Sequence, residues 1–178
     1  AAVESAFVGV YVEDALSFSL TEPAQERVRH VHPATGFDPQ QLGAQCDRCP
    51  LRHPSRPPVG AEYPLDGCAP EFAIVGEAPG PTETQSGRPF DGASGKLLEQ
   101  LGRPAGIRRD RAVVTNAVAC MPPGTDFGTF EARFQLENSD RKREGRPALD
   151  HPMDCCRPRL EAETRGVRDV ISMGARAM

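Results

Sequence analysis

The 178-residue sequence contains no tryptophan, only two tyrosines and only two lysines. It has no apolar run near the roughly 18–20 residues that a membrane-spanning helix needs, and its mean hydropathy is -0.46. The first twenty residues lack a basic start and carry three acidic side chains, so we expect no secretory signal peptide and a cytoplasmic protein. These absences exclude membrane, collagen-like and small disulfide-stapled proteins, and they predict a soluble domain.

The excess of acidic charge is confined to the N-terminal quarter of the chain. Residues 1–45 hold six acidic and two basic residues, whereas residues 46–178 hold nineteen of each. All but two of the 21 basic residues are arginine, a bias that fits either GC-rich coding or selection for bidentate phosphate contacts. Because positive and negative charges balance over residues 46–178, this part of the chain is not typical of a protein that binds nucleic acid non-specifically. It still permits a local basic face.

After Pro70 the sequence alternates between apolar strands and helices. The strands are predicted at residues 72–75, closed by Gly76, and at 112–118 and 167–173; the helices are predicted at 93–101 and 153–165. In the first helix, Leu97, Leu98 and Leu101 are expected to share one buried face. The alternation predicts an α/β fold with a parallel sheet covered on both faces, and sites at the carboxyl ends of its strands.

Two further segments lie outside this pattern. Residues 1–45 are expected to form an N-terminal extension, either strand-like at 6–12 and 16–20 or a linker, before a domain over 46–178. Residues 125–150 interrupt the domain as an insertion, in which three phenylalanines share one helical face. A basic run with Arg141, Lys142 and Arg143 follows them. The run is either part of a solvated excursion or an arm that contacts DNA phosphates.

Four of the six cysteines have a spacing typical of a metal centre. Cys46 and Cys49 form a C-x-x-C pair, Cys120 follows a predicted strand, and Cys156 opens a predicted helix. Zinc sites usually contain two C-x-x-C pairs. One such pair plus two single cysteines fits a four-thiolate iron–sulfur cluster at least as well. Isolated cysteines are also often small buried hydrophobes. Cys155 and Cys156 do not easily both ligate, because neighbours on a helix point about 100° apart.

The densest motif runs from residue 76 to residue 98. It reads as a strand, a tight turn with the carboxylate of Glu77, a second glycine-rich turn that presents Phe90, and the start of a helix. Backbone amides in such turns can hold an anion or a carbonyl oxygen. Nucleotide binding is an equally open interpretation of these turns alone, although neither G-x-G-x-x-G nor a P-loop is present.

Taken together, the motifs resemble the iron–sulfur uracil-DNA glycosylases of the family 4/5 type. The matching strings are CDRCPL, the GEAPG to LL segment, TNAVACMPPG and CRPRLEAE, at residues 46–51, 76–98, 115–124 and 156–163. The resemblance implies an α/β three-layer sandwich with a central parallel sheet, C-terminally truncated. It also implies a 4Fe–4S cluster on Cys46, Cys49, Cys120 and Cys156, with zinc as the alternative, and excision of uracil from DNA in base excision repair.

The resemblance assigns roles that fit the chemistry of each residue. Phe90 would stack on a base turned out of the duplex, and Asn116 would read its edge with a donor and an acceptor. Glu77 would position or activate the attacking water. Gly76 and Ala78 would bind uracil, and amides around Glu77 and Ala78 would stabilise charge on the leaving base. Each of three side chains also has an interpretation without function. Phe90 would be a buried core residue, Asn116 a residue that forms a turn, and Glu77 a solvated carboxylate.

The sequence departs from the family in two places. The expected C-terminal segment with a His-Pro-Ser loop is absent, and His151 precedes the Cys156 helix and cannot replace it. The insertion lacks the base-reactive histidine of a related branch. We therefore expect part of a longer polypeptide, or a partner that supplies the missing motif, in a bacterial or phage-encoded setting. One alternative is a catalytically impaired DNA-binding module. The other is a protein-interaction domain that a metal stabilises and that has no role on DNA.

Overall fold

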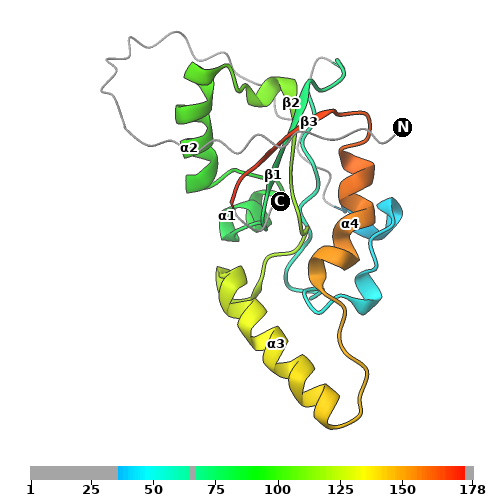
Figure 1. The fold of residues 1–178 in the computed structure, drawn as a ribbon. Coiled ribbons are helices and arrows are strands. Elements are labelled where there is room, and N and C mark those ends of the chain that lie inside the picture. The colour runs from blue at the N-terminus through cyan, green and yellow to red at the C-terminus, as the bar shows by residue number, and fades with distance from the viewer. Residues whose placement is uncertain (1–35, 65–66, 175–178) are drawn as a thin grey trace.

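The computed structural model describes residues 36–64 and 67–174, which form a three-stranded parallel sheet with helices on either side. The sheet order is β2-β1-β3 (Figure 1). The predicted strand-like pieces at 6–12 and 16–20 lie outside the described residues. The strands are β1 (Phe72–Gly76), β2 (Ala112–Asn116) and β3 (Asp169–Ser172), and the α-helices are α1 (Pro81–Ser86), α2 (Ala93–Gly102), α3 (Phe127–Arg143) and α4 (Pro152–Glu163).

The central strand β1 and the edge strand β2 are short apolar runs that are buried almost throughout. β1 pairs in register with β2 from Phe72 opposite Ala112 to Gly76 opposite Asn116. Every residue of β2 is buried, as expected for a strand covered on both faces. β2 ends two residues before the predicted end at 118, because the chain bends from residue 117 onward. The amides of Ala117 and Val118 still donate to the carbonyls of Gly76 and Glu77, at 2.7 and 3.1 Å.

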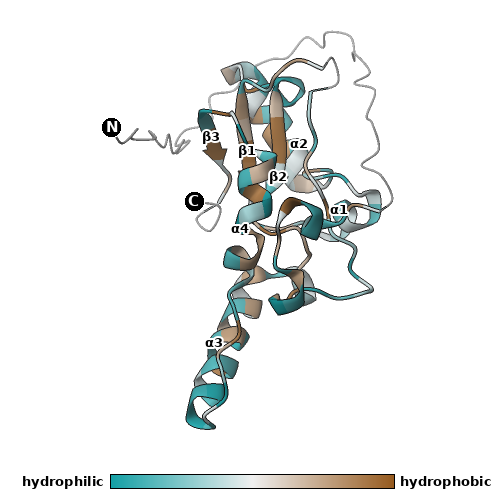
Figure 2. Ribbon diagram, turned by 90° about the vertical axis from the view of Figure 1, so that its right-hand side faces the viewer, coloured by the Kyte–Doolittle hydropathy of each residue, from teal (hydrophilic) through white to brown (hydrophobic). Residues whose placement is uncertain are grey.

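Helices cover the two faces of the sheet and create the predicted three layers. On one face, Leu98 of α2 packs with Ile74 and Val114. On the other, Leu160 of α4 packs against Ala73 and its neighbours. The sheet lies between α2 and α4 in Figure 1, and it is the most hydrophobic part of the ribbon in Figure 2. The α/β sandwich predicted from the sequence is confirmed.

One predicted helix face is wrong. Leu98 is buried, but Leu97 and Leu101 are each 53% exposed. The buried stripe of α2 consists of Gly95, Leu98 and Gly102, spaced by three and four residues. A Cβ on Gly95 would lie 1.7 Å from the Phe90 carbonyl oxygen, so α2 packs through its own backbone and its other leucines turn outward.

The predicted insertion at 125–150 consists of α3 and its return loop, and α3 extends away from the sheet (Figures 1 and 2). Phe127 and Phe134 are buried, and Phe130 stacks on Phe134 with ring centroids 6.0 Å apart, so the predicted helical face is confirmed. Asn138 ties α3 to the return loop through both backbone groups of Leu149. No helix in the described part of the chain is long and apolar enough to cross a membrane.

Candidate functional site

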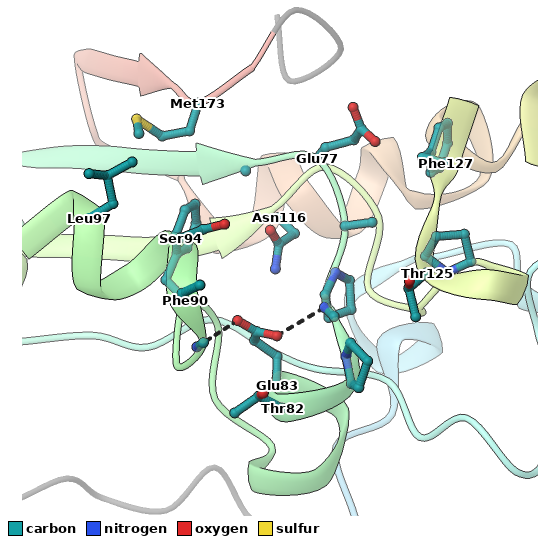
Figure 3. Close-up of a pocket in the computed structure, with 18 residues that line it drawn as sticks. Glu77, Thr82, Glu83, Phe90, Ser94, Leu97, Asn116, Thr125, Phe127 and Met173 are labelled. Atoms are coloured by element: carbon teal, nitrogen blue, oxygen red, sulfur yellow. Dashed lines mark hydrogen bonds between the residues drawn. The ribbon is translucent and has the colours of Figure 1, made fainter. Parts of the chain in front are cut away.

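A cavity of about 660 Å³ opens at the carboxyl ends of β1 and β2. Its walls come from the turn after β1, the first turns of α1 and α2, the end of β2 and the loop before α3 (Figure 3). This is the edge at which parallel sheets place their sites. The structure brings all five predicted base-handling residues to this cavity, namely Gly76, Glu77, Ala78, Phe90 and Asn116.

Phe90 and Asn116 converge over Gly76. A Cβ on Gly76 would lie 2.4 Å from Asn116 Oδ1 and 2.7 Å from Phe90 Cζ. Both side chains are buried, with 8% of Phe90 and 5% of Asn116 exposed, so their positions are fixed by packing. An aromatic ring edge and an amide therefore meet at the floor of the cavity, which suits a flat polar ring with donors and acceptors on its edge.

Two carboxylates line the cavity in different ways. Glu77 follows β1 and is partly buried, and in Figure 3 its carboxyl group points to the opposite side from that of Glu83. Glu83 is buried and accepts hydrogen bonds from the amides of Gly80 at 3.0 Å and Gly92 at 2.9 Å. Glu83 thus ties the two glycine-rich turns together, and Glu77 is the other carboxylate in the cavity lining.

Sequence reasoning gave Glu83 no role, although a signal for it was present. A glutamate at the third position of a helix commonly reaches back to the amide of the N-cap residue. Gly80 is the N-cap of α1 and Glu83 is that third position. The additional bond to Gly92, nine residues further on, depends on how the second turn folds and has no local signal.

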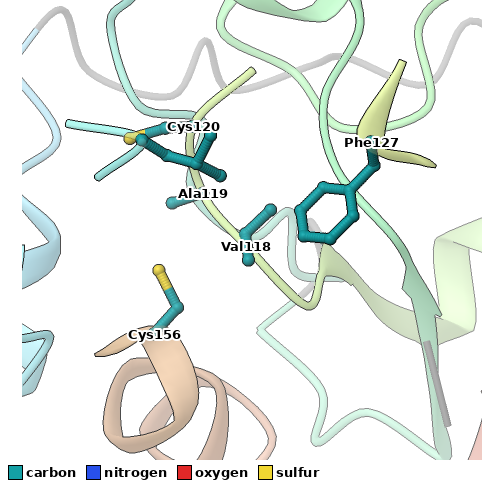
Figure 4. Close-up of a cluster of buried hydrophobic side chains, with 6 residues drawn as sticks. Val118, Ala119, Cys120, Phe127 and Cys156 are labelled. Atoms are coloured by element: carbon teal, nitrogen blue, oxygen red, sulfur yellow. The ribbon is translucent and has the colours of Figure 1, made fainter. Parts of the chain in front are cut away.

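The four predicted ligand cysteines lie near one another, in the C-x-x-C segment, the loop after β2 and α4. Cys46, Cys120 and Cys156 are buried, and Cys49, Cys120 and Cys156 belong to one apolar cluster. Figure 4 shows the Cys156 side chain rising from α4 toward the loop that carries Cys120. α4 begins at Pro152, so Cys156 lies in its second turn and does not open the helix as predicted.

Burial and mutual proximity dominate the acid–base behaviour of these thiols. Burial raises the pKa of Cys49 to about 12 and that of Cys120 to about 11, and the nearby Cys156 adds to both shifts. Burial also raises the pKa of Cys46, with Arg52 opposing and Cys156 adding to it. Cys156 is therefore close enough to influence each of the other three.

The donor set fits a four-thiolate centre in type and burial. Soft sulfur ligands from three separate segments suit an iron–sulfur cluster or zinc, and a cationic centre would offset the repulsion between neighbouring thiolates. Within residues 36–64 and 67–174, however, no three His, Cys, Asp or Glu side chains are arranged as a metal site. The cysteines are thus gathered in one region but do not have ligating geometry in this structure.

Cys155 lies in the same region, although sequence reasoning excluded it. It is 1% exposed, and a hydrogen bond with Cys49 partly offsets the rise that burial causes in its pKa. Its backbone carbonyl accepts from the amide of Gln45 at 2.9 Å, which anchors the C-x-x-C segment to α4. Cys68, by contrast, is exposed.

The predicted DNA-contacting residues lie at the end of α3, outside the cavity lining. Arg141 pairs with Glu137 at 3.2 Å and donates to the carbonyl of Pro147 at 3.1 Å. Arg143 pairs with Asp140. Two of the three charges are thus already balanced by neighbours on the helix, and contact between DNA and Arg141, Lys142 and Arg143 remains a prediction.

A buried arginine connects α4, which carries Cys156, to the end of β2. Arg159 of α4 is fully buried and donates to the carbonyls of Asn116 at 2.8 Å and Ala117 at 3.0 Å. Its other amino group donates to Glu163 at 2.6 Å and to Thr115 at 3.0 Å. Sequence reasoning missed this residue, and the only local signal was an arginine and a glutamate four residues apart on a predicted helix.

Comparisons with known proteins show the family to which the chain belongs. The model of the family described as "Uracil DNA glycosylase superfamily" matches residues 65–178. The Type-4 uracil-DNA glycosylase of Pyrobaculum aerophilum is 41% identical over 83 residues, which are 47% of this chain and 41% of the relative. That of Thermotoga maritima is 42% identical over 87 residues, which are 49% and 44% of the two chains. That of Sulfurisphaera tokodaii is 42% identical over 80 residues, 44% of this chain and 34% of the relative. The chain therefore spans less than half the length of these relatives.

Proposed function

This chain belongs to the uracil-DNA glycosylase superfamily, and on that premise we propose that it excises uracil from DNA by hydrolysing the bond between the base and deoxyribose. The observation that carries the proposal is the convergence of the Phe90 ring and the Asn116 amide over Gly76, at the floor of the cavity. The Type-4 relatives share more than two fifths of the aligned residues.

Recognition begins with a base that has left the duplex stack. Its face would lie on Phe90, since aromatic stacking holds an extruded base without a requirement for sequence. Asn116 would offer one donor and one acceptor to the pairing edge of the base. Uracil and cytosine have opposite donor and acceptor patterns on that edge, so a fixed amide accepts the first and rejects the second.

Bond cleavage would place positive charge on the sugar and negative charge on the departing base. Glu77 follows the same strand end and is partly buried at the cavity wall, where its carboxylate would position the attacking water and face the cationic sugar. Backbone groups of Gly76 and Ala78 would bind the base as it gains charge. The base leaves as uracil, and the sugar keeps the hydroxyl of the water.

An oligonucleotide with a single uracil tests this proposal. Asn116→Ala and Glu77→Gln should each lower the single-turnover excision rate, the second by about 10²–10⁴-fold, as expected for loss of general acid–base catalysis. Glu99→Gln, an equivalent change on the exposed face of α2, should leave the rate unchanged. Excision that survives both cavity changes would remove the site assignment. Binding without release of the base by the unaltered chain would instead indicate a DNA-binding module.

We propose that Cys46, Cys49, Cys120 and Cys156 hold a 4Fe–4S cluster. The burial of Cys46, Cys120 and Cys156 and the origin of all four cysteines in three separate segments support this assignment. When bound, the cluster would cross-link the C-x-x-C segment, the loop after β2 and α4, which is a structural contribution. A reducing cytoplasm, where we expect the protein to act, favours thiolate ligation over disulfides.

Anaerobic purification distinguishes the cluster from zinc. The protein should be brown and contain iron with acid-labile sulfide, whereas colourless protein with stoichiometric zinc would refute the cluster. Cys156→Ser should lower the iron content. Cys155→Ser should retain iron, which checks the choice between two adjacent buried cysteines. Cys68→Ser is the matched control, because Cys68 is exposed.

A further inference from the structure

Phe90 adopts a backbone conformation that few residues other than glycine tolerate. Its φ is 53°, in the left-handed region. For a bulky residue this conformation is strained, and it persists only where surrounding contacts enforce it. The enforcing contacts act on the backbone carbonyl of Phe90, and they therefore fix the direction in which its ring leaves the chain.

The main enforcing contact comes from Arg109. Its Nη1 donates to the Phe90 carbonyl oxygen at 2.7 Å, and its Nη2 donates to the carbonyl of Pro89. A guanidinium holds two adjacent carbonyls at a defined angle because its donors are rigid and coplanar. The Arg109 side chain is only 10% exposed, so water competes little for these bonds.

Arg109 is in turn fixed by Glu62. Arg109 Nε donates to Glu62 Oε1 at 2.7 Å, and its Nη2 donates to Oε2 at 2.9 Å. Arg88 binds the same carboxylate at 3.1 Å. Glu62 itself exchanges two backbone hydrogen bonds of 2.9 Å with Val114 in β2. A continuous series of bonds thus runs from the edge strand β2 to the Phe90 backbone.

We propose that Arg109, oriented by Glu62, is a positioning residue that sets the angle of the Phe90 ring against which the base stacks. This inference rests on the proposed function, and it deepens that function by assigning a role to two residues outside the cavity lining. Arg109 would act only through Phe90. Its contribution to excision should therefore disappear when the ring is removed.

A double-mutant cycle tests the kinetic part of the proposal. Arg109→Lys keeps the charge but loses the paired donors, and it should lower the single-turnover excision rate by at least tenfold. In a Phe90→Leu background the same change should have less than a twofold effect. Arg108→Lys is the matched control, since Arg108 is the exposed neighbour that pairs with Asp110. Equal losses from Arg109→Lys in both backgrounds would overturn the proposal.

A spectroscopic measurement tests the structural part without substrate. Fluorophenylalanine labelling gives one ¹⁹F resonance for each of the eight phenylalanines, and the Phe90 signal is identified by its absence from Phe90→Leu. Arg109→Lys should shift the Phe90 signal and leave the Phe130 signal in α3 unchanged. Glu62→Gln should shift the same signal, and it provides a second variant if Arg109→Lys does not fold.

The two measurements separate failure of this inference from failure of the proposed function. If the unaltered chain does not excise uracil, the function is wrong, but the Phe90 resonance still reports on Arg109. An unmoved Phe90 resonance in folded Arg109→Lys and Glu62→Gln proteins would overturn the positioning role, whatever the activity.

Discussion

At the scale of single residues, Gly76 determines whether the cavity floor can exist. Asn116 and Phe90 occupy the space that any larger residue at position 76 would need. The requirement is one of space and not of backbone freedom, because Gly76 does not have a positive φ. The last residue of β1 thus decides how closely the ring and the amide approach each other.

Gly76→Ala should abolish excision while the protein stays folded. The added methyl group would lie 2.4 Å from Asn116 Oδ1, and displacing its neighbours should cost about 1–3 kcal/mol of stability. Urea unfolding measures that cost, and single-turnover excision measures the loss of activity. Gly106→Ala is the control: its Cβ would meet open space at φ 78°, so it should lose about 1–2 kcal/mol but keep activity. Full activity in Gly76→Ala would show that the floor is not where uracil binds.

At the scale of elements, the sequence predicts best where a segment carries its own signals. β1 and α2 were located to within a residue, since each ends at a glycine. The end of β2 was predicted too late because Ala117 and Val118 are apolar and buried, although neither belongs to the strand. The outward turn of Leu97 could not be predicted, because it follows from the close approach of Gly95 to the Phe90 carbonyl, which depends on how the turn before α2 folds.

The candidate site divides in the same way. Gly76, Phe90 and Asn116 follow from ordered motifs, and the structure places them together. The residues that hold them were missed, since Arg109 and Arg159 both donate to backbone carbonyls far away in the chain. Any residue can supply a carbonyl, so no residue type at the accepting position marks such a contact. The partner is defined only by the fold.

The buried pair between α4 and β2 gives a prediction at this scale. Arg159→Met leaves Glu163 buried without its cationic partner and should destabilise the protein by about 3–5 kcal/mol in urea unfolding. Arg159→Met with Glu163→Leu should recover part of that loss, because both charges are gone. Arg157→Met is the control, as Arg157 lies on the same helix but is 65% exposed. A double variant no more stable than Arg159→Met would assign the cost to the lost carbonyl contacts instead.

At the scale of the whole molecule, the thiol region and the cavity are neighbours, because Ala78 and Phe127 belong both to the cavity lining and to the apolar cluster around the thiols. The thiols lie beside α4, and the cavity lies toward α1 and α2. Arg159 connects the first region to the end of β2, and Glu62 connects the middle of β2 to Phe90 through Arg109. A three-stranded sheet thus depends on ionised side chains for its internal order, which makes its stability sensitive to acid.

Glu62 gives that sensitivity a definite sign. Burial alone would raise the pKa of Glu62, but the hydrogen bonds and charges of Arg109 and Arg88 outweigh it and hold the pKa below its usual value of 4.5. A carboxyl group whose pKa is lower in the folded state stabilises the protein above its unfolded pKa, and this contribution is lost as the pH falls through the folded pKa.

Wild type should therefore be more stable than Glu62→Gln at pH 7, and the difference should shrink steadily below pH 4.5. Urea unfolding of both proteins from pH 7 to pH 3 measures this difference in the free energy of unfolding. The contributions of the other titrating groups cancel, because both proteins contain them. Glu99→Gln, exposed on α2, should follow wild type throughout. A difference that stays constant over the whole range would mean that Glu62 acts through its shape and not through its charge.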